Sequence, residues 1–311
     1  MFSNYVLIID VCYVYLKALR KENIMRIQRH LRFLWKKKEC KMQKHKRQNK
    51  PSNRNGFPVE EEVCVSYTIL YFVIIRMSNI SQLILGETGC VSYIIHCTEK
   101  KEIAIIDSFD GFEEDILEEI KRLGYPSVKY VIDTHTHADR RSASPYFVNE
   151  FGVEGIVKSE MTKYKGNKVK TKDGDVLKIG NIELKVLYTP GHTYDHNCYL
   201  VEDNLLSGDC LFIGDVGRID LGGHPREKTE LLYNSLRRLE QLPPNTKIYP
   251  NHVGSAHAID SEDTFSTISN EIKTNPAFQI KNIKEFYTYM TEGWPPKPDN
   301  WEQIIADNLN G

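Results

Sequence analysis

The segment Tyr130-Val-Ile-Asp-Thr-His-Thr-His-Ala-Asp-Arg140 decides the fold of this chain. Its apolar, β-branched residues at 131 and 132 are typical of the end of a buried strand. His135, His137 and Asp139 follow, alternating with small residues. Side chains two apart in an extended segment point the same way, so these three should share one side of a loop. Imidazole and carboxylate groups suit zinc, iron or manganese, although a solvated polar loop is the alternative.

The charge of the chain is unevenly distributed. Residues 1–76 contain 16 Lys and Arg against six Asp and Glu, whereas residues 77–311 contain 25 against 36. An acidic main body gives no reason to expect nucleic-acid binding. The seven cysteines form no C-x-x-C pair and have no regular spacing. We therefore expect free thiols and a reducing, cytoplasmic compartment.

The first 76 residues are expected to form a basic extension of low order. Residues 17–54 contain 15 Lys and Arg and only two Glu, and the apolar runs at 5–16 and 67–75 are too short to span a bilayer. The charge and cleavage site of a signal peptide are not found, so we expect no membrane association. The extension is an arm for RNA or a membrane surface, an unstructured segment, or sequence outside the native protein, and the last two are favoured. The working domain is predicted to cover residues 77–311.

Regular apolar patterns begin after Met77. They predict strands and helices in the first block at 90–97, 102–107, 112–123, 128–132, 142–151 and 155–157. Short strands separated by Gly, Asn and Asp are expected at 176–179, 182–188, 197–201 and 204–206. Then come a helix, a strand and three helical segments at 227–242, 247–249, 262–273, 281–291 and 299–309. Two β-rich blocks, each followed by helices, predict two sheets packed face to face with helices outside.

Further metal-type ligands follow later strands. His192 comes after Thr189-Pro-Gly, where the Pro-Gly pair predicts a sharp turn at a strand end. Asp209 follows Ser207-Gly, and His252 follows Tyr249-Pro-Asn, in the same relation to their strands. Loops at one edge of a rigid sheet are where sites are usually built. Together with the first loop they predict a metal site assembled from four strand ends.

This ordered set of motifs resembles the metallo-β-lactamase superfamily from about Gln82 to the C-terminus, which implies an αββα sandwich. Within it, the chain is similar to glyoxalase II-like proteins, and among them to the persulfide dioxygenase group. The residues that carry this narrower resemblance are Thr136-His-Ala-Asp139, Thr189-Pro-Gly-His-Thr193, Ser207-Gly-Asp-Cys-Leu-Phe-Ile-Gly-Asp-Val-Gly-Arg-Ile-Asp220 and Trp294-Pro-Pro-Lys-Pro298.

The resemblance implies one Fe(II) per chain, held by His135, His192 and Asp209, with Zn(II) as the alternative. Two imidazoles and one carboxylate form a facial triad with open positions for substrate and O₂. Hydrolases of the superfamily hold a second metal through the Asp of the motif and a final His, but Arg140 stands at that place here. A guanidinium has no lone pair for a metal and would repel one, so a single metal is predicted, with Arg140 able to pair with Asp139.

Other residues near the motifs receive weaker assignments. His137, Asp139 and His252 are expected beside the metal or as alternative ligands. Arg218 and Tyr194 are candidate contacts to the substrate, although an ion pair between Arg218 and Asp220, or a plain loop at Tyr194, explains them equally simply.

The implied reaction oxidises a glutathione-type persulfide with O₂ to sulfite and free thiol. The alternatives are hydrolysis of a thiolester, as in hydroxyacylglutathione hydrolases, by a metal-bound hydroxide, and a metal-binding protein without catalysis. The expected partners are the small thiol persulfide and O₂, and a homodimer is considered.

Overall fold

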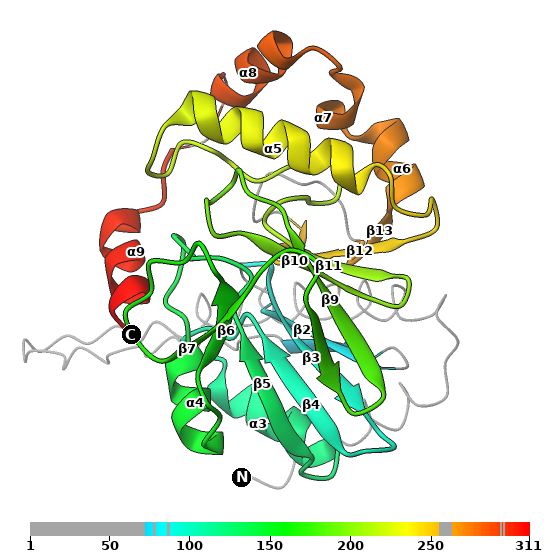
Figure 1. Cartoon of the computed structure of the whole chain (residues 1–311), viewed down its shortest axis with the longest axis vertical. Coiled ribbons are helices and arrows are strands. Elements are labelled where there is room, and N and C mark those ends of the chain that lie inside the picture. The colour runs from blue at the N-terminus through cyan, green and yellow to red at the C-terminus, as the bar shows by residue number, and fades with distance from the viewer. Residues whose placement is uncertain (1–71, 77–78, 86–87, 255–262, 293, 295) are drawn as a thin grey trace, which may run out of the picture. The chain divides into compact units, whose positions relative to one another are not determined.

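The computed structural model describes residues 72–76, 79–85, 88–254, 263–292, 294 and 296–311. Two β-sheets lie face to face, and helices cover the outer side of each (Figure 1). The αββα sandwich expected from the sequence is therefore confirmed.

The first sheet has seven strands in chain order, with β1 at one edge and β7 at the other. Strands β1 to β4 are antiparallel and β4 to β7 are parallel. Two crossover helices, α3 (Glu113–Arg122) and α4 (Ser144–Phe151), connect β4 to β5 and β5 to β6. Because β4 and β5 are parallel, the loops after them emerge at the same edge of the sheet. The strands are β1 (Phe72–Arg76), β2 (Ile80–Leu85), β3 (Cys90–Cys97), β4 (Glu102–Ile106), β5 (Ser127–Ile132), β6 (Ile156–Ser159) and β7 (Lys168–Thr171).

The second sheet has six strands in the order β13-β12-β11-β10-β9-β8. The run β8 to β11 is antiparallel, as the sequence predicts, and β12 joins parallel to β11. Its strands are β8 (Val176–Ile179), β9 (Ile182–Tyr188), β10 (Asn197–Val201), β11 (Asn204–Gly208), β12 (Lys247–Pro250) and β13 (Ser266–Thr267). The later helices are α5 (Pro225–Leu239), α6 (Ile268–Thr274), α7 (Pro276–Gln279), α8 (Ile283–Thr291) and α9 (Trp301–Asn310).

Alternation along each strand builds the layers. In β3, Tyr93 and Ile95 belong to the core between the sheets, while Ile94 belongs to the core beneath the first pair of helices. That outer core also contains Ile116 and Ile120 of α3, which are one helical turn apart. Such two-sided burial explains why the strands near the site read as almost continuous apolar runs.

Main-chain bonds between the two sheets hold them together at one edge. Cys90, the first residue of β3, forms an isolated antiparallel bridge with His252. On either side, Val91 N donates to Asn251 O at 2.8 Å and Val253 N donates to Gly89 O at 2.8 Å. The loop after β12 is thereby fixed against the start of β3.

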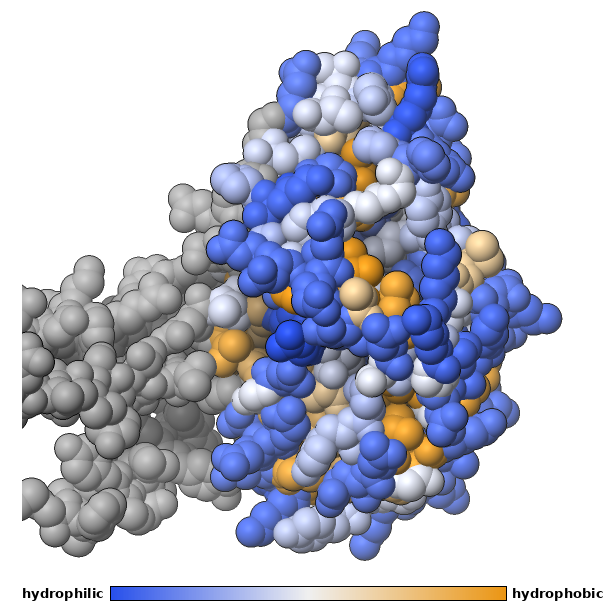
Figure 2. All heavy atoms as spheres, turned by 90° about the vertical axis from the view of Figure 1, so that its left-hand side faces the viewer, coloured by the Kyte–Doolittle hydropathy of each residue, from blue (hydrophilic) through white to orange (hydrophobic). Residues whose placement is uncertain are grey.

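The surface is largely polar where Figure 2 shows it, with apolar residues in small separated groups. Among the described residues, no helix is long and apolar enough to cross a membrane.

The expected domain boundary at Met77 falls inside the first sheet. Strand β1 lies before it and pairs antiparallel with β2 from Phe72↔Leu85 to Arg76↔Ser81. Residues 72–76 therefore belong with the sandwich. The sequence shows an apolar run at 67–75, but it does not show which strand this run pairs with. The rest of the expected extension, residues 1–71, lies outside the described residues.

We predict that protein beginning at Phe72 keeps the thermal stability of the sandwich, whereas protein beginning at Met77 melts at a lower temperature. Loss of β1 leaves β2 as an unpaired edge. Each kcal/mol of unfolding free energy lost should lower Tm by roughly 2–4 °C for a domain of this size. Circular dichroism melts of both proteins test this, and equal Tm values would show that β1 contributes nothing.

Candidate metal centre

Strand-end loops bring together three buried ligand-type side chains. His135 follows β5, His192 follows β9 and Asp209 follows β11, and one potential ligand atom from each lies within 4.8 Å of the other two. Asp209 Oδ2 is 3.8 Å from His135 Nε2 and 3.6 Å from His192 Nε2. The structure thus assembles the three residues named as metal ligands from the sequence.

Both histidines are oriented from behind. His192 Nδ1 donates to the carbonyl oxygen of Arg218 at 2.7 Å, and His135 Nδ1 lies 2.9 Å from Thr134 Oγ1. With the proton on Nδ1, each Nε2 keeps its lone pair and faces Asp209. Burial is the main cause that lowers the pKa of His192 to about 3 and the pKa of His135 well below its usual value. Neutral imidazole, the form that binds a metal, is therefore favoured at both positions.

Two glycines allow the backbone around Asp209 to close up. Gly208 has φ +52°, and a Cβ there would lie 2.6 Å from His196 Nε2, the atom that accepts the backbone N–H of Asp209 at 3.1 Å. A Cβ at Gly217 would lie only 1.9 Å from Asp209 O. This contact explains the glycine of the Gly217-Arg-x-Asp220 motif, because Arg218 O can then reach His192.

Two of the ligand-type atoms are buried without a partner in the described part of the chain. Among the described residues, His135 Nε2 and Asp209 Oδ1 are buried and have no hydrogen-bond partner. Burying such atoms without a partner is costly, and a bound cation would remove that cost. Metal–ligand bonds to N and O are about 2.0–2.2 Å. Asp209 Oδ2 lies 3.8 Å from His135 Nε2 and 3.6 Å from His192 Nε2, so one ion can bond to the carboxylate and to each histidine. The residues present therefore fit one metal ion.

His137 faces a different partner. Its Nε2 lies 3.0 Å from Asp107 Oδ1, and it groups with Asp107 and Asp133, whereas its Nδ1 is buried without a hydrogen bond among the described residues. Burial alone would lower the pKa of His137, but the bond to Asp107 and the charges of Asp107, Asp139 and Asp133 raise it to about 9. When Nε2–H donates to Asp107, the neutral ring keeps a lone pair on Nδ1, so His137 lies beside the metal site as a neighbouring residue or alternative ligand.

Asp107 is a supporting residue that the sequence reasoning missed. Besides His137, it accepts the backbone N–H of Thr134 at 2.8 Å and the amide of Asn251 at 2.8 Å. It thereby ties the loop of His135 to the loop of His252. The sequence could have indicated Asp107 by its position, because it directly follows the buried strand β4 as Asp133 directly follows β5. Its φ of +52° is uncommon for a residue with a side chain, and such conformations cluster at functional sites.

Asp195 and His196 follow His192 in the same loop and support the site. His196 stacks on His135 with ring centroids 5.1 Å apart, in addition to its bond with Asp209. Asp195 accepts from Thr136 Oγ1 at 2.6 Å. Both residues brace the ligand loops against each other.

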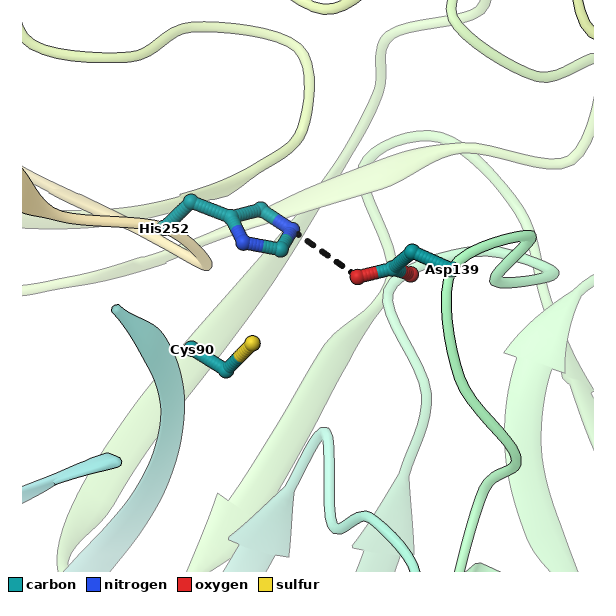
Figure 3. A group of neighbouring side chains, drawn as sticks. All are labelled: Cys90, Asp139 and His252. Carbon is teal, nitrogen blue, oxygen red and sulfur yellow. Dashed lines mark ion pairs between the residues drawn. The ribbon is translucent and has the colours of Figure 1, made fainter. Parts of the chain in front are cut away.

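Arg140 lies between Asp139 and His252. Its Nη2 is 3.1 Å from Asp139 Oδ2 and 3.1 Å from His252 Nε2. His252 Nε2 is also 3.4 Å from Asp139 Oδ2 and 3.5 Å from Asp209 Oδ2. Figure 3 shows His252 and Asp139 pointing toward each other, with Cys90 beside them. The guanidinium thus pairs with Asp139, as the sequence suggests.

The two candidate substrate residues are engaged within the protein. Arg218 forms a two-pronged ion pair with Asp220 at 2.7 and 2.9 Å, and its Nη1 donates to Pro296 O at 3.2 Å. Tyr194 donates its hydroxyl proton to Glu227 at 2.9 Å. The ion-pair interpretation of Arg218 matches this geometry, and the pair secures the C-terminal segment beside His192.

The sequence profile of the metallo-beta-lactamase superfamily matches residues 85–252, more than half of the chain. The chain belongs to this superfamily. Membership of this superfamily agrees with the two packed sheets and with the position of the site at their edge.

The chain is similar to two hydroxyacylglutathione hydrolases and to the solved structure of ETHE1. Hydroxyacylglutathione hydrolase of Dictyostelium discoideum is 30% identical over 231 residues, which cover 71% of this chain and 75% of that protein. The hydrolase of the same name from Maricaulis maris (strain MCS10) is 32% identical over 179 residues, or 55% and 67% of the two chains. The crystal structure of ETHE1 from Myxococcus xanthus superposes with a TM-score of 0.67 at 28% identity, covering 74% of this chain and 97% of that one.

We predict that Asp107→Asn weakens metal binding about 10- to 100-fold, the usual cost of losing a residue that orients a ligand. The variant keeps the size of the side chain but loses the charge that holds Thr134, His137 and Asn251. Competition with a chelator measures the affinity, and Asp173→Asn, at an exposed ion pair with Arg238, is the control. An unchanged affinity would mean that Asp107 does not support the site.

Proposed function

We propose that this protein is a mononuclear Fe(II) persulfide dioxygenase. Its substrate is a glutathione-type persulfide, and His135, His192 and Asp209 are the iron ligands. The observation that carries the proposal is the arrangement of the three ligands beside a guanidinium, which leaves room for one metal and not two. The resemblance of the motifs to persulfide dioxygenases and the similarity to ETHE1 of Myxococcus xanthus support it.

The reaction balances with water as a reactant. Persulfide, O₂ and water give free thiol and sulfite, so that the outer sulfur loses four electrons and O₂ gains four. Fe(II), when bound, supplies the open coordination positions and the redox chemistry. The chain itself fixes His192 through Arg218 O and His135 through Thr134, and it encloses the ligands in a buried site that excludes bulk water.

Thiolester hydrolysis is the second candidate, because the Dictyostelium discoideum and Maricaulis maris relatives carry the name hydroxyacylglutathione hydrolase. In that scheme His137, Asp139 and His252 would act as further ligands, around zinc. The hydrogen bonds of Arg140 to Asp139 and His252 argue against it.

We also propose that the protein works in the cytoplasm. The described cysteines, Cys90, Cys97, Cys198 and Cys210, are free thiols, as is usual in a reducing compartment.

We predict that His135→Ala, His192→Ala and Asp209→Ala each lose bound iron, since a facial triad has no spare ligand. Iron per chain, measured by elemental analysis of the purified protein, should fall from about one to near zero. His224→Ala changes an exposed histidine at the start of α5 and should keep its iron. Any triad variant with wild-type iron and activity would refute that ligand assignment.

We predict O₂ uptake on addition of glutathione persulfide, at about one O₂ for each sulfite formed. The same sample should hydrolyse S-lactoylglutathione poorly, because one metal position is filled by Arg140. An oxygen electrode and a spectrophotometric thiolester assay, run in parallel on iron-loaded protein, make the comparison. Rapid hydrolysis without O₂ uptake would establish the hydrolase instead.

A further inference from the structure

Cys90, Asp139 and His252 form a second cluster of ligand-type side chains next to the first (Figure 3). One ligand atom from each lies within 4.8 Å of the other two. Thiolate, imidazole and carboxylate are all ligands for zinc and cobalt. The cluster is also rigid, because Cys90 and His252 are joined by a main-chain bridge with hydrogen bonds on either side. The ligand types and the fixed backbone therefore suit a metal-binding position.

Arg140 contacts two members of this cluster. Its Nη2 lies 3.1 Å from a carboxylate oxygen of Asp139 and 3.1 Å from Nε2 of His252. A metal ion at about 2.0–2.2 Å from each of these two atoms would lie within about 4 Å of Nη2. The guanidinium is also permanently charged and would repel a divalent ion.

Packing holds Arg140 in this place. Its guanidinium carbon lies 3.8 Å above the centre of the Phe109 ring, a stacked arrangement that arginine favours. Phe109 is only 2% exposed and also contacts His137 edge-on at 5.1 Å. Among the described residues, Arg140 Nε and Nη1 are buried without hydrogen-bond partners. Unpaired buried donors are costly, and the charge of the guanidinium near the carboxylates of Asp139 and Asp209 offsets that cost.

We infer that Arg140 is a built-in cation that closes a second metal position formed by Cys90, Asp139 and His252, and that residue 140 sets the number of metals bound. Removal of its charge opens this position to a thiophilic divalent ion, which displaces the thiol proton of Cys90 on binding. The inference concerns the loops of the proposed active site but does not depend on which substrate they act on. Metal counting tests it, whereas the proposed function is tested by turnover.

Cobalt(II) added to the metal-free, full-length protein under anaerobic, reducing conditions separates the two positions. A thiolate ligand gives Co(II) an intense near-ultraviolet charge-transfer band, which imidazole and carboxylate ligands do not give. The wild type should bind about one Co(II) per chain without this band. Arg140→His should bind about two, and the band should appear with the second equivalent.

Two further variants test whether the charge at position 140 and the thiol of Cys90 control binding of the second Co(II). Arg140→Lys keeps the positive charge and should remain at one Co(II) without the band. In Arg140→His combined with Cys90→Ser, the second Co(II) should bind about 10- to 100-fold more weakly and without the band, because the thiol is gone.

The inference is overturned if the wild type binds two Co(II) or shows the thiolate band, or if folded Arg140→His remains at one. Circular dichroism establishes folding. Should Arg140→His not fold, Arg140→Gln removes the charge with little change in size and is held to the same criterion. A second Co(II) with the band in that variant supports the inference, and its absence overturns it.

Discussion

The compensation of buried negative charge is the constraint on which this site depends. Asp107, Asp133 and Asp209 are each at most 4% exposed, and a buried carboxylate is tolerated only with a partner. Asp133 has Lys158 at 2.7 Å, Asp107 has His137 at 3.0 Å, and Asp209 faces His135 and His192. The last carboxylate differs from the others, because burial lowers the pKa of His135, His192 and His252 around it and favours their neutral form. A bound metal cation would compensate the negative charge of Asp209.

The fold explains why so many charged groups can meet in one place. Strands β4 and β5 of the first sheet, and β9, β11 and β12 of the second, all end at the edge where the sheets are bonded to each other. The ligands lie close to the strand ends, so each has little freedom of position. Residues between the loops, such as Asn251 and His196, connect one loop to the next. Precise placement of the ligands thus follows from the rigidity of the sandwich.

Much of this arrangement is predictable from local patterns. Apolar runs reveal buried strands such as β3 and β10, alternating residues reveal β9, and an H-x-H-x-D segment directly after a strand reveals the site. Other features depend on contacts between distant residues and leave no such pattern. Asp107 acquires its role only when Asn251, 144 positions away, folds beside it. In the same way, β1 is a strand because β2 pairs with it, and Phe109 matters because Arg140 stacks on it.

Anomalous diffraction at the iron absorption edge, from crystals of the iron-loaded protein, tests whether the site holds one iron ion between His135, His192 and Asp209. We expect a single anomalous peak within bonding distance of these three side chains. A second peak between Asp139 and His252, or a single peak bonded to His137 instead of Asp209, would contradict this ligand set.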